Sequence, residues 1–214
     1  VMEGKSVILS HFAGLSAVPL CVKTQSAEEV IKLVKQIEPS FGGILLEDIK
    51  APECFEIESR LKQELSIPVF HDDQHGTAVV SLAGLINSLV LVEKNAKDVK
   101  VVINGAGAAG IATGRLLSEY GFKNIVLLDS RGILSSKRSD LNDFKLKALE
   151  FSNKKDVSGD LMDAMQGADI FIGVSVRDLL HKEHIDQMNT DPIVFALANP
   201  VPEIMPEKAK QLGV

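Results

Sequence analysis

The chain has 214 residues, of which 45% are hydrophobic, and this content can bury the core of one large domain or two small ones. The net charge of -6 at pH 7 argues against a nucleic-acid-binding surface, which needs clustered lysine and arginine. No apolar run is expected to span a membrane, because Ser81, Asn87 and Ser88 interrupt the longest one, 78–92.

The first part of the chain alternates strand-like and helix-like segments, which is typical of an α/β fold. Ser26 is the expected N-cap of the first helix, and Glu29 stands three residues later, as in a capping box. The predicted elements are helices over 26–37 and 52–65 and short strands over 44–46 and 68–70.

Two pairs of acidic residues follow the two short strands. Because a helix-length connection separates the strands, we expect a parallel pair whose carboxyl ends meet at one edge of a sheet. Glu47 and Asp48 leave the first strand, and Asp72 and Asp73 leave the second. Such an edge binds ligands in open α/β sheets, and an all-carboxylate set suits Mg²⁺ or Mn²⁺. Neighbours on an extended strand end point to opposite sides, so not all four acids are expected on one ion.

Alternatives to this metal site remain open. The acids could be helix caps or solvated loop residues. His71 and His75 have the i, i+4 spacing of zinc helices, but His71 is expected on a strand, so the two rings would not share a helical face. Lys5 stands in a segment without a helical pattern and is expected to be solvated, or to act as a base if a desolvated cleft among cations lowers its pKa.

The second part of the chain is predicted to be a Rossmann-like, doubly wound parallel sheet. A buried helix over 77–92 should join the two parts, and the domain boundary is placed near residue 75, between domains 1–75 and 76–214. The remaining predicted elements are strands over 99–104, 124–129, 169–174 and 193–198 and helices over 110–120, 140–152 and 159–166.

A glycine-rich loop lies between the first of these strands and the helix that follows it. Its sequence is Gly105-Ala106-Gly107-Ala108-Ala109-Gly110, and Asp129 ends the next strand. The first glycine permits a tight turn, the second lets the backbone approach a pyrophosphate, and the third lets the helix pack on the strand. The loop predicts a dinucleotide site.

The choice between NAD and NADP stays open at this point. Asp129 would bind the hydroxyls of the adenosine ribose, which favours NAD. Three cations close behind it could instead meet a 2'-phosphate: Arg131, Lys137 and Arg138.

The chain has only two cysteines, Cys21 and Cys54, which excludes a disulfide framework and predicts a reducing, cytoplasmic location. Both are expected to be small buried hydrophobic residues. Residue 1 is not methionine, and the chain stops after a helical pattern at 206–212. We therefore expect an excerpt of a longer protein that lacks some active-site groups.

Five segments together resemble the malic enzymes, in particular the short bacterial type. The motifs occur in order along nearly the whole chain, at 2–5, 41–49, 70–78, 102–110 and 195–200. The resemblance implies oxidative decarboxylation of L-malate to pyruvate and CO2, with NAD or NADP and with Mg²⁺ or Mn²⁺. It also implies a homodimer, with the malate- and metal-binding domain in 1–75 and the NAD(P)-binding domain in 76–214.

The resemblance also implies roles for individual residues. The implied metal ligands are Glu47, Asp48 and Asp73. Lys5 is the implied general base with Asp72 as its carboxylate partner, and Asn199 is the implied contact to substrate and nicotinamide ribose. The tyrosine acid and the substrate-binding arginine of the family are expected upstream of residue 1, since Tyr120 is expected to pack on its helix.

Two other functions fit the same motifs. A malolactic-type enzyme would retain the cofactor without net oxidation. A catalytically inactive dinucleotide-binding module would have no use for the lysine and the four acids, so their presence disfavours it.

Overall fold

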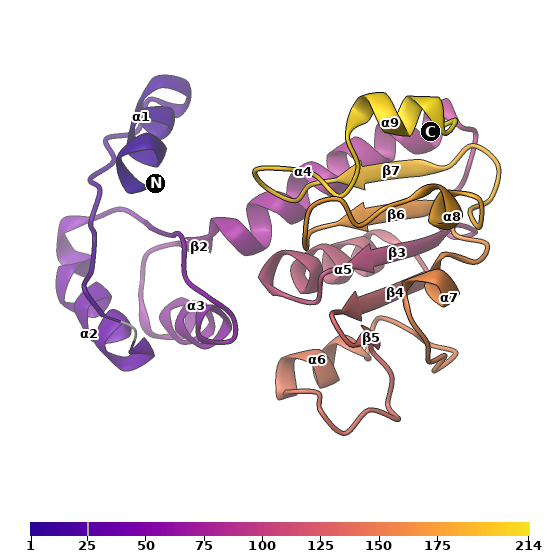
Figure 1. Ribbon diagram of the computed structural model, residues 1–214. Helices are drawn as coiled ribbons and strands as arrows, with labels where there is room; N and C mark the ends of the chain where they lie inside the picture. The colour runs from indigo at the N-terminus through magenta and orange to yellow at the C-terminus, as the bar shows by residue number, and fades with distance from the viewer. Residues whose placement is uncertain (25) are drawn as a thin grey trace. The chain divides into compact units, whose positions relative to one another are not determined.

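The computed structural model describes residues 1–24 and 26–214. The chain folds into two compact units, Val1–Asp73 and Gln74–Val214. The boundary between the two units along the chain falls within one helix, α4 (Asp72–Leu91), which is labelled in Figure 1. The assignment of malate and metal to the first unit and of the dinucleotide to the second stays a prediction at this stage.

The first unit is built on two parallel strands, β1 (Ile44–Leu46) and β2 (Val69–His71), and the predicted parallel pair is thereby confirmed. Helices α2 (Ala27–Ile37) and α3 (Glu53–Glu64) pack on each other, and a 3-10 turn, η1 (Glu38–Ser40), follows α2. Apolar residues of both helices and both strands form one core: Ile31, Val34, Leu46, Ile57, Leu61 and Val69.

The N-terminal end of α2 is capped as expected. The side chain of Ser26 accepts a hydrogen bond from the Glu29 backbone N–H at 3.4 Å. The Glu29 carboxylate, however, accepts a hydrogen bond from the hydroxyl of Thr24. Of the predicted capping box, the hydrogen bond to the Ser26 side chain is therefore present, while the Glu29 side chain binds Thr24, which precedes the helix.

Helix α1 (Met2–Ala13) was missed, because its segment has no clear apolar stripe, and none of its residues is buried. A left-handed residue, Gly14, ends it at a φ of +64°. The expectation for the cysteines is confirmed for Cys54, which is buried, and wrong for Cys21, which is exposed.

Helix α4 begins at Asp72, five residues before the predicted start at 77. Two acids in its first turn stabilise this end of the helix dipole, a signal that the apolar periodicity does not contain. The helix is not buried all round, since Val79, Val80, Val90 and Leu91 are more than half exposed. In its full length α4 is long and apolar enough to cross a membrane, contrary to our expectation, although core helices of soluble proteins pass the same test.

The second unit contains a five-stranded sheet in the order β5-β4-β3-β6-β7. All neighbouring strands are parallel except β5, which pairs antiparallel with β4. The strands are β3 (Lys100–Asn104), β4 (Asn124–Asp129), β5 (Gly132–Ile133), β6 (Ile170–Gly173) and β7 (Ile193–Ala196). The helices after α4 are α5 (Ala108–Tyr120), α6 (Asp143–Ala148), α7 (Leu161–Met165), α8 (Lys182–Ile185) and α9 (Pro206–Gln211).

Helices cover both faces of this sheet (Figure 1). Alternate strand residues point to opposite faces. Val102 and Val126 belong to the core shared with α7, α8 and α9. Ile103 lies on the other face, against Gly114 of α5. The doubly wound architecture predicted from the sequence is confirmed.

Helix α6 is shorter than the predicted 140–152. Asn142 caps its start by accepting the Lys145 N–H at 3.0 Å. Its end is set by Asn153, whose N–H donates to the Ile125 carbonyl of β4 at 2.7 Å. The backbone cannot continue a helix and meet this strand at the same point.

Candidate active site

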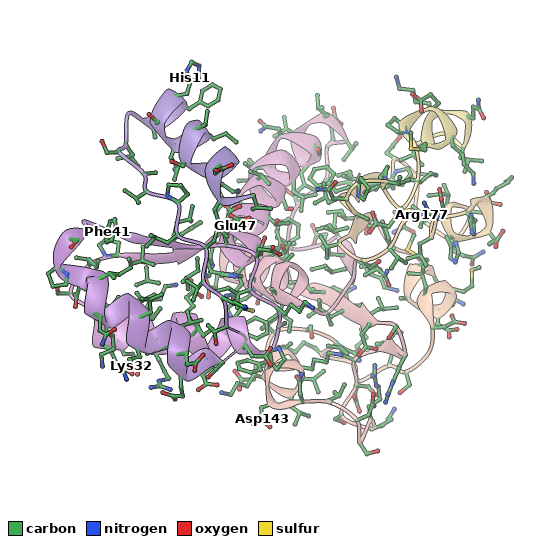
Figure 2. All side chains as sticks on the ribbon, turned by 60° about the vertical axis from the view of Figure 1, so that its left-hand side comes forward. His11, Lys32, Phe41, Glu47, Asp143 and Arg177 are labelled. Atoms are coloured by element: carbon green, nitrogen blue, oxygen red, sulfur yellow. The ribbon has the colours of Figure 1, made fainter. Side chains whose placement is uncertain are left out.

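The strand register places the acidic pairs beside each other. Leu46 of β1 lies opposite His71 of β2, so Glu47 and Asp72 follow paired positions. Figure 2 labels Glu47 just after β1. The sheet edge that the sequence predicts for the acids is present in the structure.

Lys5 of α1 lies between two of these acids. Its Nζ donates to Asp72 Oδ2 at 2.6 Å and lies 3.2 Å from Glu47 Oε2. The hydrogen bond to Asp72 raises the pKa of Lys5, Glu47 adds to it, and burial opposes it. The expectation of a solvated lysine is therefore wrong, and its surroundings are anionic rather than cationic.

Glu47 is the most buried acid of this group, with a side chain that is 9% exposed. Burial raises the pKa of Glu47. The hydrogen bond and charge of Lys5 oppose this rise, and the negative charges of Asp73 and Asp72 add to it. Its Oε2 is buried and makes no hydrogen bond of regular geometry, despite the close ammonium of Lys5. This oxygen retains acceptor capacity for a cation.

Asp48 and Asp73 connect the two strand ends directly. The Asp48 N–H donates to Asp73 Oδ2 at 3.0 Å, with Asp48 in the left-handed region at a φ of +57°. Asp72 and Asp73 lie in the first turn of α4 and not on an extended strand, so the expected alternation of their directions does not apply. Asp73 Oδ2 is also 3.7 Å from His71 Nε2.

The four acids at this sheet edge form what we call the carboxylate cluster: Glu47, Asp48, Asp72 and Asp73. Its chemistry suits a hard cation. Its donors are all oxygens, one buried oxygen lacks a regular hydrogen bond, and burial, with a smaller repulsion by Asp73 and Asp72, raises the pKa of Glu47. Across residues 1–24 and 26–214, no three His, Cys, Asp or Glu side chains are gathered as a finished metal site. The residues whose carboxylates could hold a cation are Glu47, Asp48 and Asp73.

The zinc-helix alternative does not match the structure. His71 ends β2 whereas His75 belongs to α4, so the two residues do not share a helix. Glu58 of α3 is a further buried acid near these residues, which the sequence did not reveal; its carboxylate accepts a hydrogen bond from the His71 N–H at 3.3 Å. In the sequence, Glu58 stands four residues before Lys62, with which it forms an ion pair in the structure. This spacing is typical of exposed helix surfaces, so it did not indicate a buried acid.

The glycine loop of the second unit has the turn that the sequence predicts. Gly105 follows β3 with a φ of +124°, and its N–H donates to the Leu128 carbonyl at 2.9 Å. A Cβ at Gly105 would lie 2.6 Å from the Val174 carbonyl oxygen. Only glycine fits this turn without displacing the end of β6.

The other two glycines differ sharply in their surroundings. A Cβ at Gly110 would lie 1.8 Å from the Gly105 carbonyl oxygen, whereas a Cβ at Gly107 would meet nothing within 4 Å. Gly107 is exposed, and Ala108 and Ala109 begin α5 half-buried behind it. The loop thus has packed glycines at its ends and an open backbone in the middle, as an approaching pyrophosphate requires.

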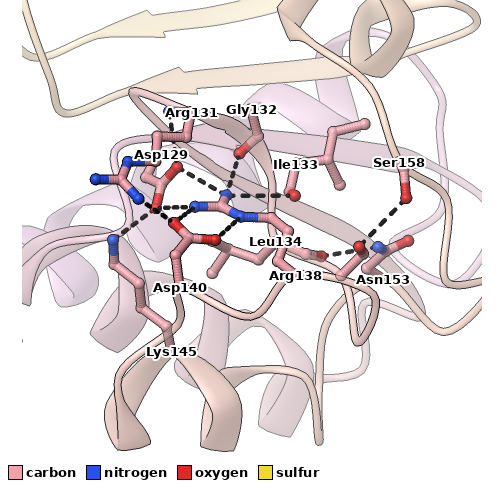
Figure 3. A network of polar contacts seen from close by, with 11 residues as sticks. Asp129, Arg131, Gly132, Ile133, Leu134, Arg138, Asp140, Lys145, Asn153 and Ser158 are labelled. Atoms are coloured by element: carbon pink, nitrogen blue, oxygen red, sulfur yellow. Dashed lines mark hydrogen bonds and ion pairs between the residues drawn. The ribbon is translucent and has the colours of Figure 1, made fainter.

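Asp129 ends β4 inside a network of cations (Figure 3). Arg138 donates to both of its oxygens at 2.8 and 3.0 Å, and Lys145 donates to Oδ2 at 2.6 Å. Burial acts to raise its pKa, but these hydrogen bonds and the Arg131 N–H outweigh it and lower the pKa of Asp129 to about 2. Asp140 in turn binds Arg138 and Arg131.

Asn199 lies after β7, at the same carboxyl edge as the glycine loop, and is exposed. This location suits a contact to a bound dinucleotide. Its role remains a prediction.

Comparisons with known proteins match the whole chain. The family described as "Malic enzyme, NAD binding domain" matches residues 74–212, and "Malic enzyme, N-terminal domain" matches residues 22–62. A "Bifunctional malic/malolactic enzyme" of Bacillus subtilis is 52% identical over 100% of this chain and 52% of its own length. An "NADP-dependent malic enzyme" of Halomonas elongata is 46% identical over 99% of this chain and 50% of its own length.

A solved structure agrees with these matches. The crystal structure of an NAD-dependent malic enzyme from Thermotoga maritima has 49% identity and a TM-score of 0.96, covering 100% of this chain and 57% of that one. The chain spans about half the length of the curated relatives it matches. By sequence and by fold, the chain belongs to the malic enzyme family.

Proposed function

We propose that the full-length protein oxidises and decarboxylates L-malate to pyruvate and CO2, with hydride transfer to NAD(P)⁺. The observation that carries the proposal is the contact of Lys5 with Asp72 and Glu47 in a chain that also has an open dinucleotide loop. A binding module that lacks chemistry would not need a half-buried lysine between carboxylates.

In this mechanism Lys5 moves the proton. Lys5 Nζ would accept the proton of the malate C2 hydroxyl once a cation on the neighbouring carboxylates offsets the negative charge that raises its pKa, and a bound nicotinamide would supply the hydride acceptor. Asp72 Oδ2, at 2.6 Å, then stabilises and orients the ammonium. A divalent cation, when held by Glu47, Asp48 and Asp73, would polarise the hydroxyl and stabilise the negative charge that develops as CO2 departs.

The glycine loop and Asp129 would bind the dinucleotide. The exposed backbone at Gly107 leaves room for the pyrophosphate at the start of α5. Asp129 supports NAD, because its carboxylate would accept the ribose hydroxyls, and it holds Arg138 away from a 2'-phosphate. Relatives carry both cofactor names, so NAD rather than NADP is the finer part of the proposal.

The test is an assay of the full-length protein with L-malate, Mn²⁺ and each dinucleotide in turn. We expect NADH, pyruvate and CO2 in equal amounts, and a larger kcat/KM with NAD than with NADP. Absence of both pyruvate and lactate with either dinucleotide would overturn the proposal in favour of the inactive module.

A malolactic reaction is the second candidate, favoured by the name of the Bacillus subtilis relative. The same assay separates the two, because a malolactic enzyme would form lactate without accumulating NADH. A homodimer is also part of the proposal and rests on the family resemblance alone, whereas a cytoplasmic location rests on the presence of only two cysteines.

A further inference from the structure

A buried carboxylate lies at the carboxyl edge of the second unit, outside the site described above. Glu203 is 0% exposed. Its Oε1 accepts the Ser175 N–H at 2.9 Å, and its Oε2 accepts the Ala198 N–H at 3.1 Å. These two N–H groups belong to the loops that leave β6 and β7, so one side chain ties two neighbouring strand ends together.

The surrounding residues are built around this carboxylate. A Cβ at Gly173, the last residue of β6, would lie 2.2 Å from Glu203 Cδ. The link also extends to β3, where Asn104 Nδ2 donates to Ser175 Oγ at 2.6 Å, directly before the glycine loop. Asn104, Ser175 and Glu203, which we call the edge clamp, thus connect the ends of β3, β6 and β7.

The edge clamp lies on the side of the glycine loop away from Asp129. Asp129 is on β4, which flanks β3 on one side, whereas β6 and β7 lie on the other. A dinucleotide with its adenosine ribose at Asp129 and its pyrophosphate at Gly107 extends its nicotinamide half toward β6 and β7. Asn199 is the residue after Ala198, whose N–H the clamp holds.

We propose that Glu203 is a positioning residue that fixes the loops after β6 and β7 for the nicotinamide half of the dinucleotide. The inference rests on the proposed function, since it assumes a dinucleotide at the glycine loop. Burying a neutral side chain would cost less free energy, but a carboxylate offers a strong acceptor to each of two backbone N–H groups at once. Glutamine keeps one acceptor and turns an N–H donor toward the other backbone N–H.

The test compares two ligands on the full-length protein by titration calorimetry. NADH and ADP share the adenosine and the two phosphates, but only NADH has the nicotinamide and the ribose that carries it. Glu203→Gln should raise the Kd for NADH about tenfold and the Kd for ADP less than about twofold. Ser175→Ala removes only the bridge to Asn104 and should give the same selectivity with a smaller change, about threefold for NADH.

Asp169→Asn is the matched control. Asp169 is 8% exposed and also accepts a backbone N–H, from Lys100 at 2.9 Å, but it lies at the opposite, amino end of β3 and β6. Its substitution should lower the melting temperature without separating the two ligands.

Each outcome of these titrations has a defined meaning. An equal loss for both ligands, or no loss, in Glu203→Gln would overturn the inference without contradicting the proposed dinucleotide site. If Glu203→Gln does not fold, Ser175→Ala decides on the same criterion. If the unaltered protein binds neither ligand, the proposed function is contradicted and the inference falls with it.

Discussion

The carboxylate cluster around Lys5 and the glycine loop after β3 differ in the kind of group that each offers to a ligand. The cluster uses charged side chains whose charges compensate one another, as Lys5 does for Glu47 and Asp72. The loop uses backbone geometry, with Gly105 and Gly110 packed and Gly107 open. If the cluster binds a cation as proposed, its acids would exchange one charged partner for another, whereas the loop already has its shape.

This difference predicts different responses to substitution. A change in the cluster should alter chemistry and cation binding with little effect on folding, because its residues are partly exposed and its ion pairs contribute little stability. A change in the packed part of the loop should affect folding first. The predictions below test this contrast.

Lys5→Ala should have the largest effect, a loss of about 10³-fold or more in kcat for malate oxidation, because the group that moves the proton is removed. The thermal melting temperature should change by no more than a few degrees. Lys35→Ala is the control, since Lys35 also pairs with an acid of this unit, Glu64, at 2.6 Å. Unchanged turnover in Lys5→Ala would remove its role as the base.

The two glycines of the loop should separate folding from binding. Gly110→Ala should lower the free energy of unfolding by about 3 kcal/mol, because its Cβ would meet backbone at 1.8 Å. Gly107→Ala should fold normally and raise the Kd for NADH about tenfold, because a methyl group would occupy the side from which the pyrophosphate approaches. Denaturant unfolding and NADH titration measure the two effects, and a reversed pattern would contradict the account of the loop.

Asp73→Asn should raise the Mn²⁺ concentration needed for half-maximal activity about tenfold or more, while the Kd for NADH stays within about twofold. The effect should also be visible in direct Mn²⁺ binding measured by electron paramagnetic resonance. Glu56→Gln, a change at an exposed acid of α3, is the control. Equal losses of metal and dinucleotide affinity would refute the division of labour between the two units.

Asp129→Ala should shift the preference from NAD toward NADP by about tenfold in the ratio of kcat/KM values. The substitution removes the acceptor for the ribose hydroxyls and releases Arg138 and Lys145, which it holds at 2.6 to 3.0 Å, toward a 2'-phosphate. An unchanged ratio would argue against a ribose contact.

Acid should weaken the second unit through Asp129. Its pKa is lowered from 3.8 to about 2 by folding, so the unfolded chain takes up a proton first as the pH falls. The ion pairs therefore stabilise the fold fully above about pH 4, and this contribution, on the order of 2 kcal/mol, is lost as the pH falls toward 2. Unfolding of the unaltered protein and of Asp129→Asn between pH 5 and pH 2 should converge at the acid end, and parallel curves would contradict the assignment.

Much of this fold could be predicted from the sequence, because its signals are local. Apolar runs identified every strand of the two units except the two-residue β5, and the glycine loop identified the β3-to-α5 turn, whereas the short helix α8 was missed. Helix α1 and the early start of α4 were missed, because neither has the apolar stripe that a sequence pattern detects. Their helical turns are positioned by tertiary contacts such as that of Lys5 with Asp72.

The site was predicted less completely than the fold. The convergence of the acidic pairs follows from strand order and could be predicted. The anionic setting of Lys5 could not, because it depends on where α1 lies in the first unit. Glu203 gave no signal, since an acid in a loop is usually solvated and only the folded backbone supplies the two N–H groups that bind it.

We propose that Glu47, Asp48 and Asp73 bind one divalent cation beside Lys5. Anomalous diffraction from crystals of the full-length protein grown with Mn²⁺ would locate this cation. We expect one strong peak about 2.2 Å from oxygens of all three side chains, with Lys5 still paired to Asp72. A peak bound elsewhere, or none at these carboxylates at saturating Mn²⁺, would contradict it.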